Sequence, residues 1–409
     1  MRIVTISPIF TPLRLKPGID PRSVMYREIL QAITTRRDLI TADQEDEEGD
    51  YDNLEKDGYD LRLFEWRPKS EEAGVRARYH IYPNGVSIAQ IEFDDVNGRD
   101  PHKLEDYAKD ETRRIIDDHA AELEKALTSA AKSIPAQYRE RQDHRDDRPT
   151  RINWIARALV FSDAERKEPA CQALIEEWLL HTAHPEDAQK LINGDTDHSM
   201  TWVRYVIVEN ATGRPEKTRM LLSAMRIAQF FYASQKALND QTQATISRAY
   251  FVKNIRRAEK MLVDARAKMQ MLRIQYGVQQ NFLNRNKRRI FDEIVKVWDF
   301  EALIENGARM NEACSARINE ISGARRERSA VVTDIILAVI GFLAVIDVSL
   351  GLTEYSREVM SRPVLEYTDN QPSRILSAVA SVDIDFMLLG GALSIILLIG
   401  IYGYWKINK

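Results

Sequence analysis

Two aspartates inside an apolar stretch are the residues of this sequence whose setting most suggests chemistry. Asp334 and Asp347 interrupt the mostly apolar segment Ala330 to Leu352. An ionised carboxylate in a membrane-spanning helix costs roughly 2.5 to 3.5 kcal/mol on insertion scales, so it usually faces a cavity, a pore or a partner. Near the end of a span the cost largely disappears. Asp334 favours such an interfacial position, and Asp347 is compatible with either an interface or a pore.

Further polar residues extend this pattern toward the end of the segment. Ser349 and Thr353 follow Asp347, and the acids Glu354 and Glu358 come next. A cation pathway requires a line of oxygen-bearing side chains of this kind. The sequence therefore marks five candidate pore-lining residues: Asp347, Asp334, Ser349, Thr353 and Glu354.

A second candidate cluster is basic. Arg285, Lys287, Arg288 and Arg289 stand close together in a region with helical periodicity. Such a cluster can contact anionic headgroups, RNA or a nucleotide ligand. A solvated helix face or turn is the competing interpretation.

Enzymatic motifs are missing from the sequence. It has no phosphate loop, dinucleotide fingerprint, nucleophile elbow or HExxH motif, so we expect no enzymatic activity and no catalytic residues. A hydrolase in an unrecognised fold is the alternative. His181 and His184 are spaced as metal ligands, but their place at an expected helix end beside Pro185 favours helix capping.

Two apolar segments, Ala330 to Leu352 and Phe386 to Trp405, must position the pore-lining candidates. A bilayer core of ~30 Å needs about 20 apolar residues in a helix, so each segment can span it. A buried soluble hairpin is the alternative. Basic residues flank the outer ends of the pair, which places both termini in the cytoplasm and the joining loop, residues 353–385, outside. These flanking residues are Arg325, Arg326, Arg328, Lys406 and Lys409, the last two in a short tail, residues 406–409.

The part before the spans mixes strand and helix signals. Residues 1–150 predict an N-terminal domain, and residues 151–213 continue it, so the expected fold is α+β or α/β. Asn84-Gly85 between two β-rich runs is a strong hairpin signal. The expected strands are residues 2–7, ending before Pro8, 61–66, 76–82, 86–93, 155–162 and 201–208, and two expected helices are 101–134 and 169–181.

The pattern of residues 214–329 predicts a long helical stalk. Apolar residues between Val252 and Tyr276 follow the three-four spacing of a coiled coil or helical bundle. Roughly seventy residues in one helix would extend about 100 Å, so a hairpin with a turn around Gly277 to Asn286, or a stalk that reaches the membrane, is expected.

Composition limits the class of partner. The net charge is −4, and acidic and basic residues are interspersed, which disfavours nucleic acid as a partner. The two cysteines, Cys171 and Cys314, match neither a zinc site nor a disulfide framework and suit a reducing compartment. No cleavable signal peptide is evident at the N-terminus.

This order of elements resembles the CorA-type divalent cation transporters. The resemblance lies in the layout alone: an α/β domain, long helices, and two C-terminal spans with both ends inside. The family's Gly-Met-Asn signature is replaced here by Ser349-Leu350-Gly351 and the residues after it, and the outer loop is longer. The resemblance implies a pentamer in the bacterial inner membrane whose first span lines a path for Mg²⁺ or another divalent cation. It transfers no site residue.

Two functions stay open. In the first, a homo-oligomer encloses a cation path between copies of Ala330 to Leu352, gated by the cytoplasmic part. In the second, the chain is a membrane-embedded effector of a bacterial antiviral defence system. Its cytoplasmic part would sense a small-molecule signal such as a nucleotide, or a protein, and then disrupt the membrane. A purely structural tether is third.

Overall fold

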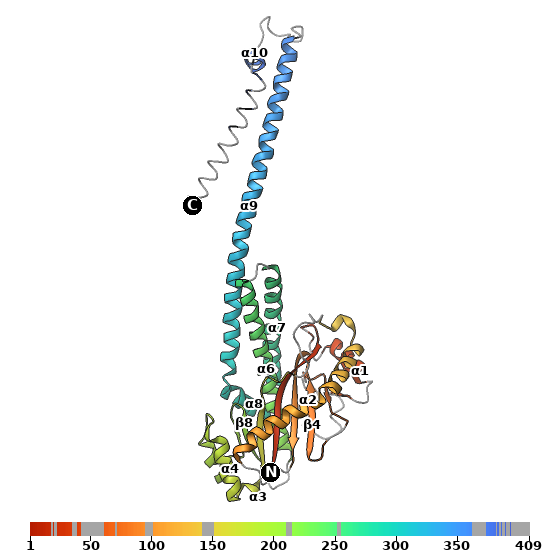
Figure 1. Ribbon diagram of the computed structural model, residues 1–409, viewed down its shortest axis with the longest axis vertical. Helices are drawn as coiled ribbons and strands as arrows, with labels where there is room; N and C mark the ends of the chain where they lie inside the picture. The colour runs from red at the N-terminus through yellow and green to blue at the C-terminus, as the bar shows by residue number, and fades with distance from the viewer. Residues whose placement is uncertain are drawn as a thin grey trace. The chain divides into compact units, whose positions relative to one another are not determined.

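The computed structural model forms two compact units, Met1–Ser315, here called the body, and Ala316–Lys409, the C-terminal unit. It describes residues 1–17, 19, 23–34, 39–41, 61–69, 72–94, 101–140, 151–209, 215–251, 255–361 and 374–381, and four isolated positions, 383, 386, 389 and 393. Figure 1 shows the elements along the chain.

A mixed sheet of eight described strands forms the centre of the body, in the order β2-β3-β4-β5-β1-β6-β8-β7. Neighbouring strands are antiparallel, except that β6 and β8 are parallel. Together with the helices, the sheet makes the fold α+β, as the sequence predicted. The strands are β1 (Arg2–Arg14), β2 (Leu39–Thr41), β3 (Phe64–Trp66), β4 (Val75–Ile81), β5 (Asn84–Phe93), β6 (Ala156–Ser162), β7 (His198–Met200) and β8 (Arg204–Glu209).

The predicted hairpin is confirmed. β4 and β5 pair antiparallel, and the chain turns at Asn84-Gly85. Gly85 has a φ of 82°, which residues other than glycine rarely adopt, and the Asn84 side chain accepts a hydrogen bond from the Val86 amide (3.1 Å).

The prediction that the first strand ends before Pro8 was wrong, because β1 continues to Arg14. Proline has no backbone N–H, so it interrupts a strand pair only where that N–H would have pointed toward the neighbouring strand. The Pro8 carbonyl accepts a hydrogen bond from the Asn153 amide (2.9 Å), and the Phe10 amide donates to the Arg151 carbonyl (3.1 Å). The backbone nitrogen of Pro8 therefore faces away from β5, and the pairing of β1 with β5 continues past Pro8.

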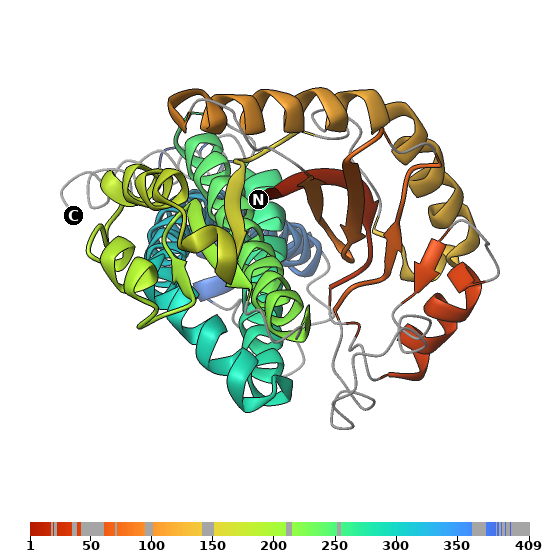
Figure 2. The same ribbon diagram turned by 90° about the horizontal axis from the view of Figure 1, so that it is seen from below.

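Helices cover both faces of the sheet, as Figure 2 shows from below. Side chains alternate along each strand, so Ile3 packs in one apolar core with α2 and α4, whereas Val4 packs in another with α6 and α8. The helices of the body are α1 (Val24–Thr34), α2 (Pro101–Ser133), η2 (Ala136–Tyr138), α3 (Asp163–Arg166), α4 (Pro169–Leu180), α5 (Asp187–Asn193), α6 (Pro215–Phe251), α7 (Ile255–Phe282), α8 (Arg285–Val297) and the first part of α9 (Phe300–Ser361).

The region predicted as a stalk, residues 214–329, divides into α6, α7, α8 and the start of α9. The break between α7 and α8 lies within the predicted turn window, Gly277 to Asn286. A coiled coil is not confirmed, because α6 packs on the sheet and many of its apolar side chains belong to the sheet's core.

The first predicted span lies within α9. This helix is continuous to Ser361, so the chain is still helical where the outer loop was expected to begin, at residue 353. The expected outer loop, residues 353–385, also contains the short helix α10 (Arg374–Ala380). The second predicted span, Phe386 to Trp405, lies outside the described residues except at positions 386, 389 and 393, and the tail, residues 406–409, lies entirely outside them.

A polar contact fixes the start of α9 against α6. Asn239 donates from Nδ2 to the Leu303 carbonyl (2.9 Å), and Gln235 donates from Nε2 to Asn239 Oδ1 (2.8 Å). Gly307 lies directly against these side chains, and a Cβ there would clash with Asn239 Oδ1. The close approach of the two helices therefore depends on the absence of a side chain at this position.

We predict that Gly307→Ala destabilises the protein by about 1 to 3 kcal/mol, since the added methyl group forces the two helices apart. Gly277→Ala is the matched control, because a Cβ at that position would meet nothing within 4 Å and alanine favours the helix. Thermal unfolding of the purified full chain should show a lower midpoint only for Gly307→Ala. Equal midpoints for the two variants would contradict the close contact.

Candidate functional site

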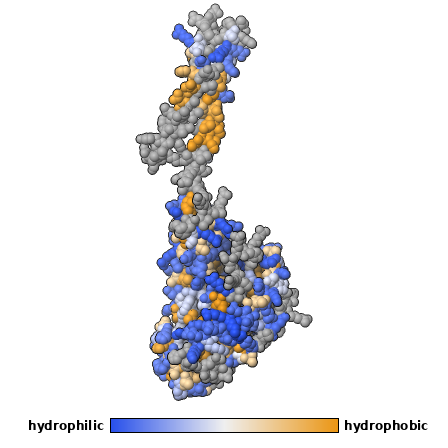
Figure 3. All heavy atoms as spheres, in the orientation of Figure 1, coloured by the Kyte–Doolittle hydropathy of each residue, from blue (hydrophilic) through white to orange (hydrophobic). Residues whose placement is uncertain are grey.

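The C-terminal unit exposes a long apolar helix surface. Thr333–Glu358 in α9 is 26 residues long and is the one described helix whose length and composition would let it cross a membrane. Figure 3 shows apolar atoms gathered along this part of α9, whereas the visible face of the body is mainly hydrophilic. An apolar surface of this size is costly to leave in water. The large apolar side chains exposed here are Ile335, Ile336, Leu337, Val339, Ile340, Leu343, Val348 and Leu352.

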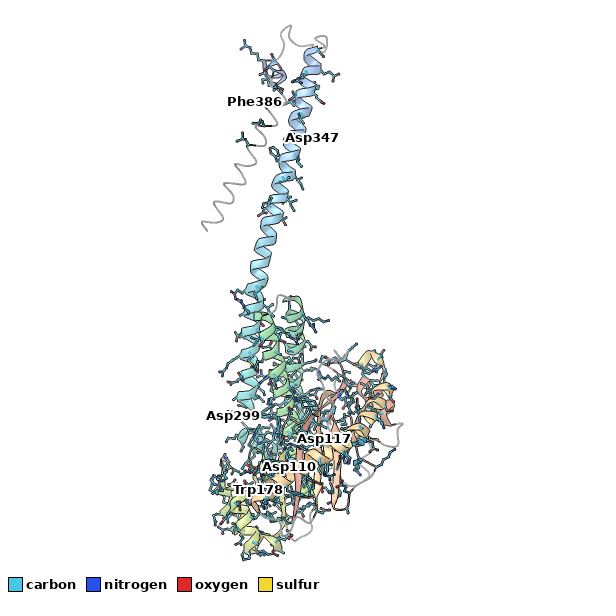
Figure 4. All side chains as sticks on the ribbon, viewed as in Figure 1. Asp110, Asp117, Trp178, Asp299, Asp347 and Phe386 are labelled. Atoms are coloured by element: carbon cyan, nitrogen blue, oxygen red, sulfur yellow. The ribbon has the colours of Figure 1, made fainter. Side chains whose placement is uncertain are left out.

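Acidic residues share one face of this helix. In an α-helix each residue turns by about 100°, so positions seven and eleven residues apart lie close together around the axis. Asp347, Glu354 and Glu358 have this spacing, and all three are exposed. Figure 4 shows the position of Asp347 on α9. The structure thus brings two pore-lining candidates, Asp347 and Glu354, onto one line.

The other pore-lining candidates lie elsewhere around α9. Thr353 is buried, with 1% of its surface exposed, and lies roughly 120° from Asp347. Asp334 is exposed but lies roughly 140° from Asp347. Ser349 belongs to α9, and its backbone position is roughly 160° from that of Asp347. One helix face therefore carries Asp347, Glu354 and Glu358, whereas Asp334 and the buried Thr353 belong to different faces.

Within a single chain these acids are not a metal centre. The described residues contain no group of three or more His, Cys, Asp or Glu side chains that could hold a metal ion.

An aromatic cluster surrounds the start of α9. Trp298, at the end of α8, is buried and donates from Nε1 to the Thr201 carbonyl (3.1 Å). Asp299, labelled in Figure 4, has a φ of 50°, a left-handed conformation that aspartate tolerates better than most residues. The chain therefore makes a sharp bend between α8 and α9. We call this region the α8–α9 junction; its aromatic side chains are Trp154, Trp202, Tyr232, Tyr276, Trp298 and Phe300.

The rings of the junction interlock mostly edge to face. Trp202 lies with its ring centre 4.6 Å from Tyr232 and 5.2 Å from Trp298. Such contacts add about 0.5 to 1.5 kcal/mol per pair beyond the area they bury. Sequence reasoning missed this cluster, because its members are separated by many residues and come together only through the fold.

The tyrosines of the junction stay protonated in neutral solution. Burial, assisted by Asp292 and Glu301, raises the pKa of Tyr276 to about 12. Burial and the charge of Asp299 also raise the pKa of Tyr232. The junction is therefore neutral at these positions, and aromatic packing rather than a tyrosinate charge holds it together.

The predicted basic cluster occupies the first turn of α8. The Asn284 side chain caps this helix by accepting a hydrogen bond from the Lys287 amide (2.8 Å). Arg285, Arg288 and Arg289 are exposed, which agrees with a solvated helix face. Three cations beside a helix N-terminus repel its positive dipole end, so the turn can accept an anion, and Arg288 already lies 3.8 Å from the Asp292 carboxylate. Ligand binding there stays a prediction.

A cavity of about 290 Å³ opens at the carboxyl ends of the parallel strands β6 and β8. Its charged groups already pair with one another: Arg2 with Glu209, and the amino group of Met1 with Glu165. The cavity therefore offers a ligand little unmatched charge.

A comparison with protein-family models, with curated proteins and with solved structures found no match to this chain. The function is therefore inferred from the geometry of the chain itself.

We predict that Trp298→Phe destabilises the protein by about 1 to 3 kcal/mol, because it leaves the Thr201 carbonyl without its indole donor. Trp202→Phe is the control, since 40% of Trp202 is exposed and its indole makes no hydrogen bond within the described part of the chain. Thermal unfolding followed by circular dichroism compares the two variants. A loss for Trp202→Phe as large as that for Trp298→Phe would show that the hydrogen bond is unimportant.

Proposed function

We propose that this chain is an oligomeric membrane protein in which α9 crosses the bilayer and lines a cation path. The span would be Thr333–Glu358, with both termini on the cytoplasmic side. The observation that carries the proposal is the line of exposed acids, Asp347, Glu354 and Glu358, on an exposed apolar helix. The exposed apolar side chains favour lipid or neighbouring helices, and the acids favour water and cations.

A single helix cannot enclose a path, so the proposal requires several copies. With their acidic faces turned inward, the copies would form rings of carboxylates at the levels of Asp347 and Glu354. Such rings attract cations and repel anions. The layout is similar to that of CorA-type transporters, which supports a pentamer and Mg²⁺ or another divalent cation as the permeant ion.

Gating would begin in the body. α9 starts at the α8–α9 junction and continues through Thr333–Glu358 as one helix. Trp298 and Gly307 fix its first turns against the sheet and α6. A rearrangement of the body that moves these contacts would therefore act directly on the helix that lines the path.

We predict that the purified protein in liposomes conducts cations, and that Asp347→Asn lowers the flux about tenfold or more by removing one ring of charge. Asp334→Asn is the matched control, because it makes the same change on the same helix away from the acidic face. Flux of Mg²⁺, Co²⁺ and K⁺ is followed with ion-sensitive dyes. No flux from a well-folded oligomer would sink the proposal, and so would equal effects of the two variants.

A further inference from the structure

The face of the sheet that packs against α6 is polar over β3, β4 and β5, although it is buried. Glu65, His80 and Gln90 lie there with 0%, 1% and 6% of their surfaces exposed. The opposite face of the same strands is apolar, with Phe64 and Tyr79 in the core beneath α2. Burying a polar side chain costs free energy unless it finds a hydrogen-bond partner. Apolar packing therefore does not explain this row of buried polar residues.

His80 is a neutral member of the row. Burial, followed by the charges of Arg226 and Arg62, lowers its pKa well below the ordinary value. Its Nδ1 lies 3.5 Å from Glu65 Oε2 and 3.4 Å from Arg62 Nη1, and its Nε2 lies 3.3 Å from Arg226 Nη1. The imidazole therefore lies between two guanidinium groups, and Nε2 accepts a hydrogen bond from Arg226 in the tautomer that carries its proton on Nδ1. A neutral imidazole thus orients the Arg226 guanidinium without neutralising its charge.

Gln90 has an unmatched acceptor. Its Nε2 donates to Glu92 Oε1 (3.1 Å), which fixes the orientation of the amide. The other end, Oε1, is buried and has no hydrogen-bond partner among the described residues. A buried carbonyl of this kind costs about 1 to 3 kcal/mol when left unpaired. Gln90 therefore favours a ligand that supplies a donor.

Arg78 lies directly opposite Gln90 in the β4–β5 register and on the same face. It is half-buried, and its side chain makes no hydrogen bond or ion pair within the described part of the chain. His80 lies two residues along β4 on the same face, and Arg226 of α6 contacts its Nε2 (3.3 Å). Two guanidinium groups and one unmatched acceptor thus belong to one neighbourhood.

We propose that Arg78, Gln90 and Arg226 form a binding site for a phosphate monoester that also carries a hydroxyl or amino donor, such as a sugar phosphate or a nucleotide. The two guanidinium groups match the dianionic phosphate, and arginine binds phosphate oxygens through paired N–H groups. The hydroxyl or amino group donates to Gln90 Oε1. A phospholipid diester carries a single phosphate charge and matches the site less well.

The site suggests how a ligand would control the protein, a step that rests on the proposed function. Arg226 and Tyr232 both belong to α6, and Tyr232 is part of the α8–α9 junction. Further along α6, Asn239 holds the start of α9. A ligand that draws Arg226 toward its phosphate would therefore act on the helix that holds α9. This agrees with the second function expected from the sequence, a signal-controlled membrane effector.

The test is isothermal titration calorimetry of the full chain in detergent with AMP, ribose 5-phosphate and inorganic phosphate. We expect AMP or ribose 5-phosphate to bind, and Arg78→Gln to weaken binding about tenfold or more through loss of a charge-assisted contact. Gln90→Leu should remove the preference for these esters over inorganic phosphate. Arg113→Gln, on the exposed face of α2, should bind like the unmodified protein. Thermal unfolding checks that each variant is folded.

No binding of any probe would overturn the site, and so would an unchanged affinity in folded Arg78→Gln. Liposome flux measured with and without the bound ester separates the two proposals. Binding without any flux would leave the site standing and contradict the cation path. Flux without binding would support the cation path and contradict the binding site.

Discussion

An apolar helix surface that the fold leaves exposed is the constraint on which the other features of this protein depend. The described part of the C-terminal unit covers little of Thr333–Glu358, so this surface requires lipid or further helices around it. Asp347 and Glu354 add a second requirement on one side, because an ionised carboxylate in lipid is costly. The proposed membrane-spanning oligomer meets both requirements, with lipid or helices on one side of α9 and water on the other.

The body supplies a rigid start for this helix. The sheet and α6 hold α9 through different kinds of contact, an indole hydrogen bond from Trp298 and a close backbone approach at Gly307. The aromatic rings around Trp298 add dispersion and edge-to-face contacts that resist small displacements. Because α6 also carries Arg226, one helix links the polar row of the sheet to the start of α9.

The sequence predicted those features that depend on local pattern. The hairpin at Asn84-Gly85, the helix from Pro101 and the first apolar segment are each encoded within one continuous stretch of the chain. It could not reveal that β1 passes through Pro8, since this depends on which neighbour the missing donor faces. The junction around Trp298 joins residues far apart in the chain, so no local pattern indicates it. The pairing of Arg78 with Gln90 belongs to the predicted hairpin, but the contact of this face with Arg226 of α6 does not follow from it. The sequence predicted the acidic line from Asp347 to Glu354 only in part. It also marked Thr353 as a pore-lining residue, but Thr353 is buried on a different helix face.

Cysteine accessibility in membranes is the sharpest test of a cation path along α9. Single cysteines are introduced by Asp347→Cys and Glu354→Cys on the acidic face, and by Val348→Cys and Leu352→Cys beside it, since the native cysteines are buried. With a water-soluble thiol reagent, we expect rapid labelling of the first pair and slow labelling of the second. Equal labelling of all four positions, or labelling of none, would contradict a membrane-spanning helix that lines a path for water and cations.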